Sequence, residues 1–444
     1  MNAFFQLVDQ YIYHMNYQNR RGFIRQSLAA AAFTIVPRHV LGKGWLAPSD
    51  VIQMGFIGTG KQSETLLKNF LKTGQVRIVA ISEIHKLKAN RFIGWHQKYY
   101  TDNLPDQTAN ELNVYPDYLE LLSRKDIDAV AIITPDHWHG PMAIQAANHG
   151  KDIYCEKPLS LTIREGRAMI NAVRKNKRVF QTGSMQRSWP NFRKACELVR
   201  NGYIGEIREV QVNVGNPPIP IDFSGEPIPE YIDWNAWLGP NDPSIYHHYL
   251  APGLEDTYWA KWRDYKPFGG GQVTDYGAHM FDIALWGLGL DGVGPEKLIP
   301  PQNIPTTGDI RGIELQFRHH APIRHFDFGQ KNAVRFIGKE GTIDISRSNF
   351  TTPDTLKDLQ LKSSDVHLPI TESHYQDFIH CMRTRSKPIC DIEIGHSTAT
   401  VCNLINIAYQ LKRSLVWNSK KEIFRHDDEA NTLLTRKHWE QFAG

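Results

Sequence analysis

Residues 51–71 hold the feature that most constrains the fold, an apolar segment that runs directly into a glycine loop and then into a helical pattern. Residues 51–57 predict a short buried strand, which Gly58-Thr59-Gly60-Lys61-Gln62-Ser63 follows. The first glycine permits a tight turn, the second lets the backbone approach a pyrophosphate, and the N-terminus of the next helix offers free N–H groups. We therefore expect a dinucleotide to bind at Gly58, Thr59, Gly60, Lys61 and Gln62.

The second predicted strand, residues 76–82, ends at Glu83. A carboxylate at this position accepts hydrogen bonds from the adenine ribose hydroxyls and repels a 2'-phosphate. The sequence therefore favours NAD over NADP, although Lys86 and Lys88 lie close enough in the chain to weaken that preference. The alternative interpretation of Glu83 is an exposed charge at the end of a strand.

Strands and helices continue to alternate after Glu83. Residues 127–134, 151–155 and 179–182 predict strands, and residues 141–149 and 163–176 predict helices. This alternation predicts an α/β fold with a Rossmann domain over residues 50–183, whose doubly wound parallel sheet places its ligand at the carboxyl ends of the strands. The residues at such ends that we expect to line the cofactor crevice are Thr134, Pro135, Asp136, His139, Glu156 and Lys157.

The pattern changes after residue 183. The next predicted strands alternate like those of a large, mostly antiparallel sheet, so residues 184–444 are expected to form an α+β substrate domain. These strands are residues 206–215, 310–317, 324–328, 333–337 and 342–345, and a Pro-rich loop covers residues 217–229.

Aromatic side chains gather in the segment around the expected cleft, and their flat faces suit the C–H surfaces of sugars and cyclitols. We expect one or two of them to touch substrate and the others to pack in the core. They are Trp189, Trp234, Trp237, Tyr246, Tyr249, Tyr258, Trp259 and Trp262. Arg187, Arg263 and Lys266 are candidates for binding polar or acidic substituents.

The formal net charge of +4 comes from the N-terminal segment, because residues 1–46 contain five basic residues and one acidic residue. The neutral remainder offers no broad surface for a phosphate backbone, which argues against nucleic-acid binding. Five cysteines without a Cys-x-x-Cys pair argue against a disulfide framework and a structural zinc site. His137 and His139 have no nearby ligand partner beyond Asp136, so no metal is expected.

Residues 1–46 predict an export leader. Asn19-Arg20-Arg21-Gly22-Phe23 precedes an apolar run over residues 27–36, which is too short to span a bilayer, since a spanning helix needs about 20 apolar residues. The pattern resembles the bacterial twin-arginine signal, although Asn19 stands where Ser or Thr is usual and no clear Ala-x-Ala site follows. We expect a periplasmic protein without a stable membrane span, or a cytoplasmic one if this segment instead forms a basic first turn on a short buried helix.

Five separated motifs resemble, in their order, the Gfo/Idh/MocA family of oxidoreductases. They are the glycine loop, Thr134-Pro135-x-x-x-His139, Glu156-Lys157-Pro158, Gly183-Ser184-Met185-Gln186-Arg187 and the segment 269–282, which contains Asp275-x-x-x-His279. The likeness covers nearly the whole chain from Val51, and the leader and tail are similar to an exported branch found in sugar-degrading bacteria.

The resemblance implies roles for individual residues. Gln186 joins the cofactor-binding set, Lys157 and His279 act beside the nicotinamide, and Asp275 helps to hold the substrate hydroxyls. It also implies that the open face of the second sheet mediates homo-oligomerisation.

The implied chemistry is oxidation of a secondary hydroxyl of a sugar or cyclitol by a tightly held nicotinamide cofactor. Removing the hydroxyl proton requires a base with a pKa near ambient pH, which histidine supplies. Lys157 can orient the oxygen and stabilise its developing negative charge. Asp275 and His279 are four residues apart, so on one helix they share a face.

Two other functions stay open. One is a glycosidase that uses bound NAD for transient oxidation followed by elimination, as one branch of the family does. That branch carries Tyr and His groups near the strand after the Glu-Lys-Pro helix, and residues 183–187 do not show them. The other is a non-catalytic sugar-binding or partner-binding relative, in which binding survives the loss of Lys157 and His279.

Overall fold

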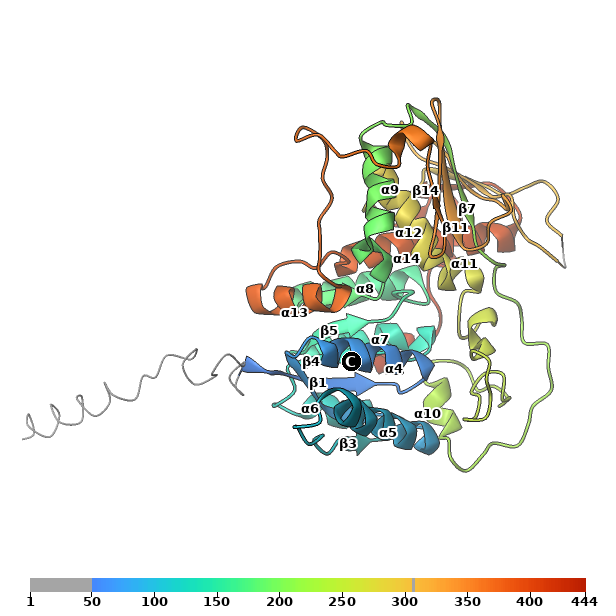
Figure 1. Cartoon of the computed structure of the whole chain (residues 1–444). Coiled ribbons are helices and arrows are strands. Elements are labelled where there is room, and N and C mark those ends of the chain that lie inside the picture. Colours follow the sequence, from blue (N-terminus) through green and yellow to red (C-terminus); the bar gives the residue numbers. More distant parts are fainter. Residues whose placement is uncertain (1–49, 306–307) are drawn as a thin grey trace, which may run out of the picture. The chain divides into compact units, whose positions relative to one another are not determined.

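The computed structural model describes residues 50–305 and 308–444. The predicted leader therefore lies outside the described residues. Within them the chain forms one parallel sheet followed by a larger, mostly antiparallel sheet, which confirms the predicted α/β class (Figure 1). No helix in these two described ranges combines the length and the apolar character needed to cross a membrane.

The parallel sheet has six strands among the described residues, in the order β3-β2-β1-β4-β5-β6. The strands are β1 (Ile52–Ile57), β2 (Val76–Ser82), β3 (Asn113–Tyr115), β4 (Ala129–Ile132), β5 (Asp152–Cys155) and β6 (Phe180–Thr182). The helices are α4 (Lys61–Lys72), α5 (Lys86–Asn103), α6 (Tyr118–Ser123), α7 (Asp136–Asn148) and α8 (Ile163–Lys175). The chain reverses its winding direction between β1 and β4, which is where such sheets bind their ligands.

Helix α7 begins five residues before the predicted start, and Pro141 lies inside it. A proline inside a helix leaves one backbone carbonyl without its usual partner. Here the carbonyl of His137 accepts a hydrogen bond of 2.5 Å from the guanidinium of Arg436 instead. The C-terminal segment therefore supplies the hydrogen bond that Pro141 cannot, and α7 extends back to Asp136 at the edge of the ligand crevice.

The second sheet has nine strands among the described residues, in the order β13-β12-β11-β7-β10-β9-β8-β14-β15. Its strands are β7 (Ile207–Asn213), β8 (Lys297–Ile299), β9 (Glu314–Gln316), β10 (Ile323–His325), β11 (Ala333–Gly338), β12 (Thr342–Ser346), β13 (Phe350–Thr351), β14 (Leu415–Asn418) and β15 (Ile423–Phe424). Strand β9 is shorter than predicted because Gly312 adopts a positive φ of 100°, and because the Asn216 side chain binds the N–H of Ile310.

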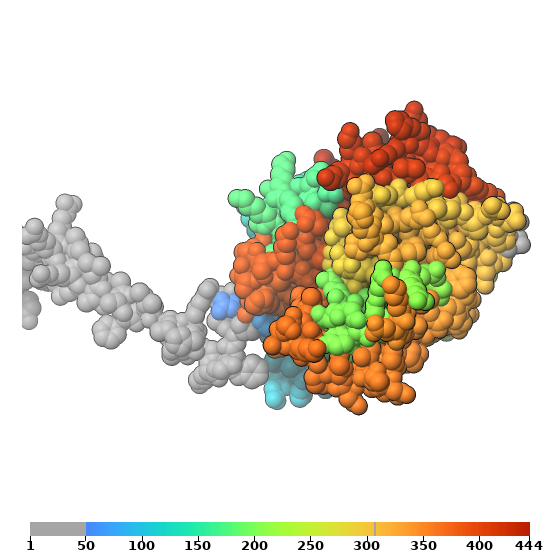
Figure 2. Space-filling model, turned by 90° about the horizontal axis from the view of Figure 1, so that it is seen from above, coloured from blue at the N-terminus to red at the C-terminus, as the bar shows by residue number. Residues whose placement is uncertain are grey.

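Helices cover the inner face of this sheet. They include α9 (Pro190–Arg200), α12 (Gly277–Leu288) and α14 (Ile392–Leu411), and the short α11 (Gln272–Asp275) leads into α12. Helix α13 (His374–Thr384) packs instead on the parallel-sheet domain, where Phe378 lies against Phe70 of α4. Helix α12 approaches β11 closely, because a Cβ at Gly287 would lie 2.6 Å from the ring of Phe336. Figure 2 shows the orange segment beside the green α9, where the N–H of Leu368 donates to the Glu197 carboxylate at 2.9 Å.

Arg187 is part of this core and does not bind substrate, contrary to the prediction. Its side chain is 2% exposed, and its guanidinium makes two hydrogen bonds of 2.8 Å to Asp282 of α12 and two to Asp291. A buried guanidinium needs such paired carboxylates because burial of an unpaired charge is costly. Asp282 and Asp291 therefore stabilise the folded core by pairing with Arg187.

Residues 217–271, named the cap here, begin with the predicted Pro-rich loop over residues 217–229, which contains no helix or strand, and form a small aromatic core of their own. The cap contains α10 (Trp234–Leu238), and its buried side chains include Trp234, Trp237, Tyr246 and Phe268. It reaches the parallel sheet, where α10 lies beside α5 (Figure 1) and Ile232 pairs with His85 after β2. The cap therefore extends over the crevice at the carboxyl ends of the parallel strands.

Candidate active site

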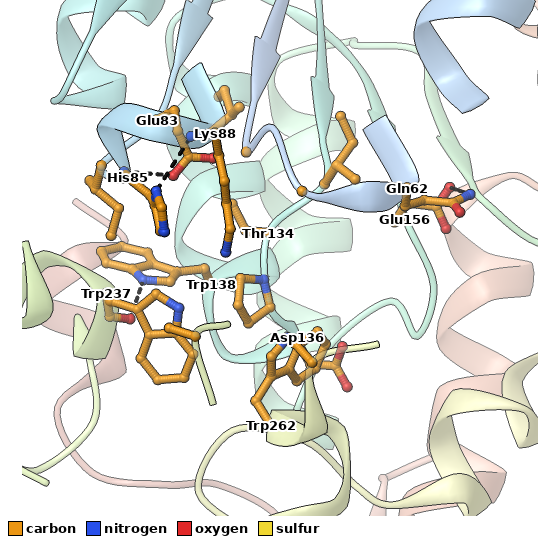
Figure 3. Close-up of a pocket in the computed structure, with 18 of the residues that line it drawn as sticks. Gln62, Glu83, His85, Lys88, Thr134, Asp136, Trp138, Glu156, Trp237 and Trp262 are labelled. Carbon is orange, nitrogen blue, oxygen red and sulfur yellow. Dashed lines mark hydrogen bonds between the residues drawn. The ribbon is translucent and has the colours of Figure 1, made fainter. Parts of the chain in front are cut away.

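A cavity of ≈ 950 Å³ lies at the carboxyl ends of the parallel strands. Its walls come from the loops after β1, β2, β4 and β5, from the cap, and from α11 and α12 (Figure 3). Pockets for small molecules usually enclose roughly 300–1,000 Å³. This cavity lies at the upper end of that range, as a site for a dinucleotide together with a second small molecule requires.

The glycine loop forms one wall as predicted. Gly58 has a φ of 89°, and a Cβ there would lie 2.8 Å from the carbonyl oxygen of Ile133. Gly60 precedes α4, and in the described residues no side chain caps that helix and nothing lies within 4 Å of a Cβ built at Gly60. The uncapped helix N-terminus beside this open space fits a pyrophosphate.

Glu83 lies at the end of β2 and lines the cavity. One of its carboxylate oxygens accepts hydrogen bonds from Thr59 N at 2.7 Å and Thr59 Oγ1 at 2.9 Å. The other accepts from His85 N at 2.9 Å (Figure 3). The Thr59 side chain is fully buried, so it positions Glu83 instead of contacting the ligand. Lys88 and Arg91 line the same region, and neither Arg91 nor its role was predicted.

Lys61 lines the cavity but its ammonium group binds the cap. Its Nζ donates to the backbone oxygens of Asp256 at 2.9 Å and Tyr258 at 2.7 Å. The residue therefore joins the glycine loop to the cap across the mouth of the crevice. Sequence spacing could not reveal this, because the two segments are nearly two hundred residues apart.

The strand-end residues divide into two groups. Thr134, Pro135 and Asp136 line the cavity, and the Thr134 hydroxyl has no hydrogen-bond partner among the described residues, which leaves it available to a ligand. His139 does not line it: the ring contacts the backbone oxygens of Pro158 at 2.8 Å and Thr134 at 3.0 Å. Burial lowers the pKa of His139 to about 4, so the ring is neutral at ambient pH and donates a hydrogen bond to only one of these two carbonyls.

Of the two glutamines predicted to bind the cofactor, Gln62 lines the cavity and Gln186 does not. Gln186 is 1% exposed and lies behind Met185, which reaches the cavity instead. The Gln186 amide has no hydrogen-bond partner within residues 50–305 and 308–444. Gln62 lines the cavity and donates to Glu156 Oε1 at 3.3 Å (Figure 3). Burial raises the pKa of Glu156, although Lys157 opposes that shift.

Lys157 and Asp275 form an ion pair in the cavity wall, and Lys157 Nζ also lies 3.0 Å from the backbone oxygen of Asp275. Arg263 Nε lies 3.7 Å from the same carboxylate. Burial favours the neutral form of Asp275, but Lys157 and Arg263 outweigh it and lower the pKa of this carboxyl. Asp136 is buried close by, where burial and the charge of Asp275 raise its pKa well above the usual value.

His279 lines the same cavity as Lys157 and Asp275. The predicted single helix is two helices, α11 and α12, which meet at Tyr276, and both residues still face the cavity. Burial, with smaller contributions from Lys157 and Arg347, lowers the pKa of His279 well below 6.5. The imidazole is therefore neutral at ambient pH, and its Nδ1 has no hydrogen-bond partner in the described part of the chain.

The sequence held no signal for Arg347 and only a general one for Trp259. Arg347 follows β12 and reaches the cavity from the second sheet, with its guanidinium 5.6 Å from the ring centroid of Tyr276. Trp259 belongs to the predicted aromatic segment, but only the folded cap shows that it lines the cavity. Lys266, predicted to bind substituents, instead donates to Gln410 outside the cavity.

Glu226, His247 and His248 have the spacing of metal ligands within the cap. The backbone N–H of Tyr249 donates to His247 Nδ1 at 3.1 Å, which places the ring proton on Nε2, facing Glu226. His248 Nδ1 lies 2.7 Å from the same carboxylate. A protonated Nε2 cannot ligate a metal, so these three side chains connect two cap loops by hydrogen bonds.

Comparison with known proteins matches both halves of the chain. The family model described as the Gfo/Idh/MocA oxidoreductase family, NAD-binding Rossmann fold, matches residues 52–184. The model of the C-terminal alpha/beta domain of the same family matches residues 220–443.

Relatives with curated descriptions match over a shorter length. A glycosyl hydrolase family 109 protein of Shewanella baltica is 31% identical over 189 residues, and an alpha-N-acetylgalactosaminidase of Shewanella oneidensis is 32% identical over 189 residues. Each match covers 41% of this chain and 39% of the relative, so the chain spans well under half the length of these relatives.

Solved structures share the fold at low sequence identity. The aldose-aldose oxidoreductase from Caulobacter crescentus, complexed with glycerol, has a TM-score of 0.57 at 18% identity, covering 82% of this chain and 99% of that one. Levoglucosan dehydrogenase, in complex with NADH and levoglucosan, has a TM-score of 0.55 at 20% identity, with coverage of 82% and 99%.

The contacts of Lys61 predict slow release of the dinucleotide. Replacing Lys61→Met removes two hydrogen bonds from a charged donor, each worth about 1.5–3 kcal/mol when desolvated and less at this partly open position. We expect NAD to dissociate roughly tenfold faster, as measured by displacement of bound NAD in stopped flow. Lys68→Met removes an exposed pair with Glu64 on the same helix and should leave the rate unchanged. Equal rates for the parent and Lys61→Met would contradict this role.

Proposed function

Because the chain belongs to the Gfo/Idh/MocA family of oxidoreductases, we propose that it is an NAD-dependent dehydrogenase acting on a secondary hydroxyl of a sugar or cyclitol. One observation carries the proposal. Lys157 from the parallel sheet and His279 from the second half of the chain line the same cavity as the glycine loop. A cation and a neutral base in one cavity support a reaction at an alcohol bound there.

The chain supplies positioning and proton transfer, and a bound nicotinamide supplies the hydride acceptor. Lys157 is fixed by Asp275, so its ammonium group can orient the substrate oxygen and stabilise negative charge on it. His279 lines the cavity and is neutral, so its imidazole can take up the hydroxyl proton. Asp275 shares its carboxylate with Arg263 and can accept a hydrogen bond from a neighbouring substrate hydroxyl.

The cap supports a tightly held cofactor. It contacts the loops that surround the crevice at three places: Lys61 binds the oxygens of residues 256 and 258, Trp138 Nε1 donates to Trp237 O at 3.1 Å (Figure 3), and Ile232 pairs with His85. A dinucleotide beneath these contacts leaves only when they break. Such retention suits an enzyme that works where no free NAD is present.

A second candidate is a glycosidase that uses bound NAD for transient oxidation and elimination. Its support is the match to glycosyl hydrolase family 109 proteins. The two solved structures described above are instead an oxidoreductase and a dehydrogenase. The two candidates differ in product. Release of nitrophenol from aryl glycosides without added NAD would favour the glycosidase, and net accumulation of reduced nucleotide would favour the dehydrogenase.

The main test is reduction of enzyme-bound NAD by a panel of sugars and inositols, followed through nicotinamide absorbance. We expect His279→Asn to slow reduction about 10²–10⁴-fold, the range for loss of a general base. Lys157→Met should slow it about 10²–10³-fold. His149→Asn replaces an exposed histidine that follows α7 outside the cavity and should leave the rate unchanged. Full activity in both cavity variants would refute these roles.

The pKa of His279 makes a separate prediction about pH. A base works only when unprotonated, and the folded protein holds the pKa of His279 well below 6.5. The rate should therefore be flat from pH 8 down to 6.5 and fall only at lower pH. The positive charge of oxidised nicotinamide disfavours protonation of the imidazole, so it should lower the pH at which the rate falls still further. The measurement is kcat/KM against pH on the NAD-loaded enzyme. A midpoint above pH 6.5 that disappears in His279→Asn would show that the imidazole is not kept neutral.

The export and assembly of the chain are also proposals. The twin-arginine pattern at Arg20 and Arg21 supports export to the periplasm. The broad second sheet supports a homo-oligomer. Cell fractionation of the parent and of a variant with both arginines changed to lysine should show a periplasmic protein only for the parent, and sedimentation should give a mass above that of one chain. Periplasmic recovery of both proteins, or a monomeric mass, would reject the corresponding proposal.

A further inference from the structure

Trp259 is the only exposed tryptophan among the described residues, and it lines the cavity. Its side chain is 54% exposed, while Trp262 and Trp237 nearby are buried. An exposed indole that lines a cavity offers a flat apolar face to a bound molecule. We infer that Trp259 is a stacking surface for a second sugar unit, so that the substrate is a glycosidically linked sugar rather than a free monosaccharide. This inference rests on the proposed function.

Arg263 connects Trp259 to the reacting end of the cavity. Its guanidinium carbon lies 5.4 Å from the ring centroid of Trp259 and 4.2 Å from that of Trp262, and its Nε lies 3.7 Å from the Asp275 carboxylate. One guanidinium group therefore separates the indole from the carboxylate beside Lys157. A sugar held by Lys157, Asp275 and His279 would place the unit bonded to it next to Trp259.

The charges at this position favour a neutral sugar unit. Arg263 is shared with Asp275, so it is not a free cation that would select a carboxylate or sulfate on the second unit. An indole face instead suits the C–H surface of a neutral pyranose. Because the ring is more than half exposed, a large part of it remains accessible beyond its contact with Arg263.

The backbone on both sides of Trp259 is held in place. Lys61 binds the carbonyl of Tyr258, and the N–H of Lys261 donates to the carbonyl of Tyr249 at 2.7 Å. The Lys261 ammonium also lies 3.8 Å from the ring centroid of Tyr249. A ring on a fixed segment loses little conformational entropy when it binds, so the stacking surface is already formed in the free protein.

The test compares disaccharides with their constituent monosaccharides on the NAD-loaded full chain, in the parent and in Trp259→Ala. We expect the variant to raise KM about tenfold for disaccharides, the effect of losing one aromatic contact, with kcat unchanged and monosaccharide KM changed less than twofold. Trp259→Phe should restore most of the affinity. Phe326→Ala removes a side chain that is 43% exposed outside the cavity and should have no effect.

Titration calorimetry with the same sugars separates this inference from the proposed function. Disaccharide binding that depends on Trp259 supports the stacking surface even if no sugar reduces bound NAD, an outcome that would reject the dehydrogenase alone. An equal rise in KM for both sugar classes, or no rise for either, overturns the inference while the dehydrogenase stands. If neither class binds nor reacts, both are rejected.

Discussion

The ion pair between Lys157 and Asp275 joins the two halves of the protein at the point where chemistry is expected. Lys157 follows a strand of the parallel sheet, and Asp275 ends a helix that leads into the core of the second sheet. Both side chains are about 15% exposed, so their charges are only weakly screened by water. Arg263 and Asp136 complete a group of two cations and two carboxyls, in which burial and the charge of Asp275 raise the pKa of Asp136 well above its usual value. The two carboxyls offset the positive charges of Lys157 and Arg263 near the buried His279.

The cap gives this site its second property, enclosure. A Rossmann crevice by itself is open along the carboxyl edge of the sheet. Here an aromatic segment with its own core covers that edge and is held by side chains of the cofactor loops, including Lys61 and Trp138. The same segment carries Trp259 at the mouth of the cavity. Retention of the cofactor and choice of substrate would therefore depend on one piece of chain.

The relatives with curated descriptions and the structural neighbours point to different reactions on a shared scaffold. Both proposed reactions begin by oxidising a sugar and differ in what happens to the oxidised product. In either proposal a neutral imidazole beside a fixed ammonium group would serve that first step. This explains why the geometry of Lys157 and His279 supports oxidation more directly than it decides between the two products.

Local patterns determined the parts of the molecule that depend on neighbouring residues. The strand, glycine loop and helix of residues 52–72, the carboxylate at Glu83, and the strand-end positions of Lys157 and Asp136 follow from spacing, because backbone geometry imposes them over a few residues. Tertiary structure decided which side chains reach the cavity and which are engaged elsewhere in the fold. It placed Arg187 between the buried carboxylate of Asp282 and the more exposed one of Asp291, directed Lys61 to the cap, and brought Arg347 and Trp259 to the cavity. Such outcomes depend on contacts between segments far apart in the chain, which no local spacing encodes.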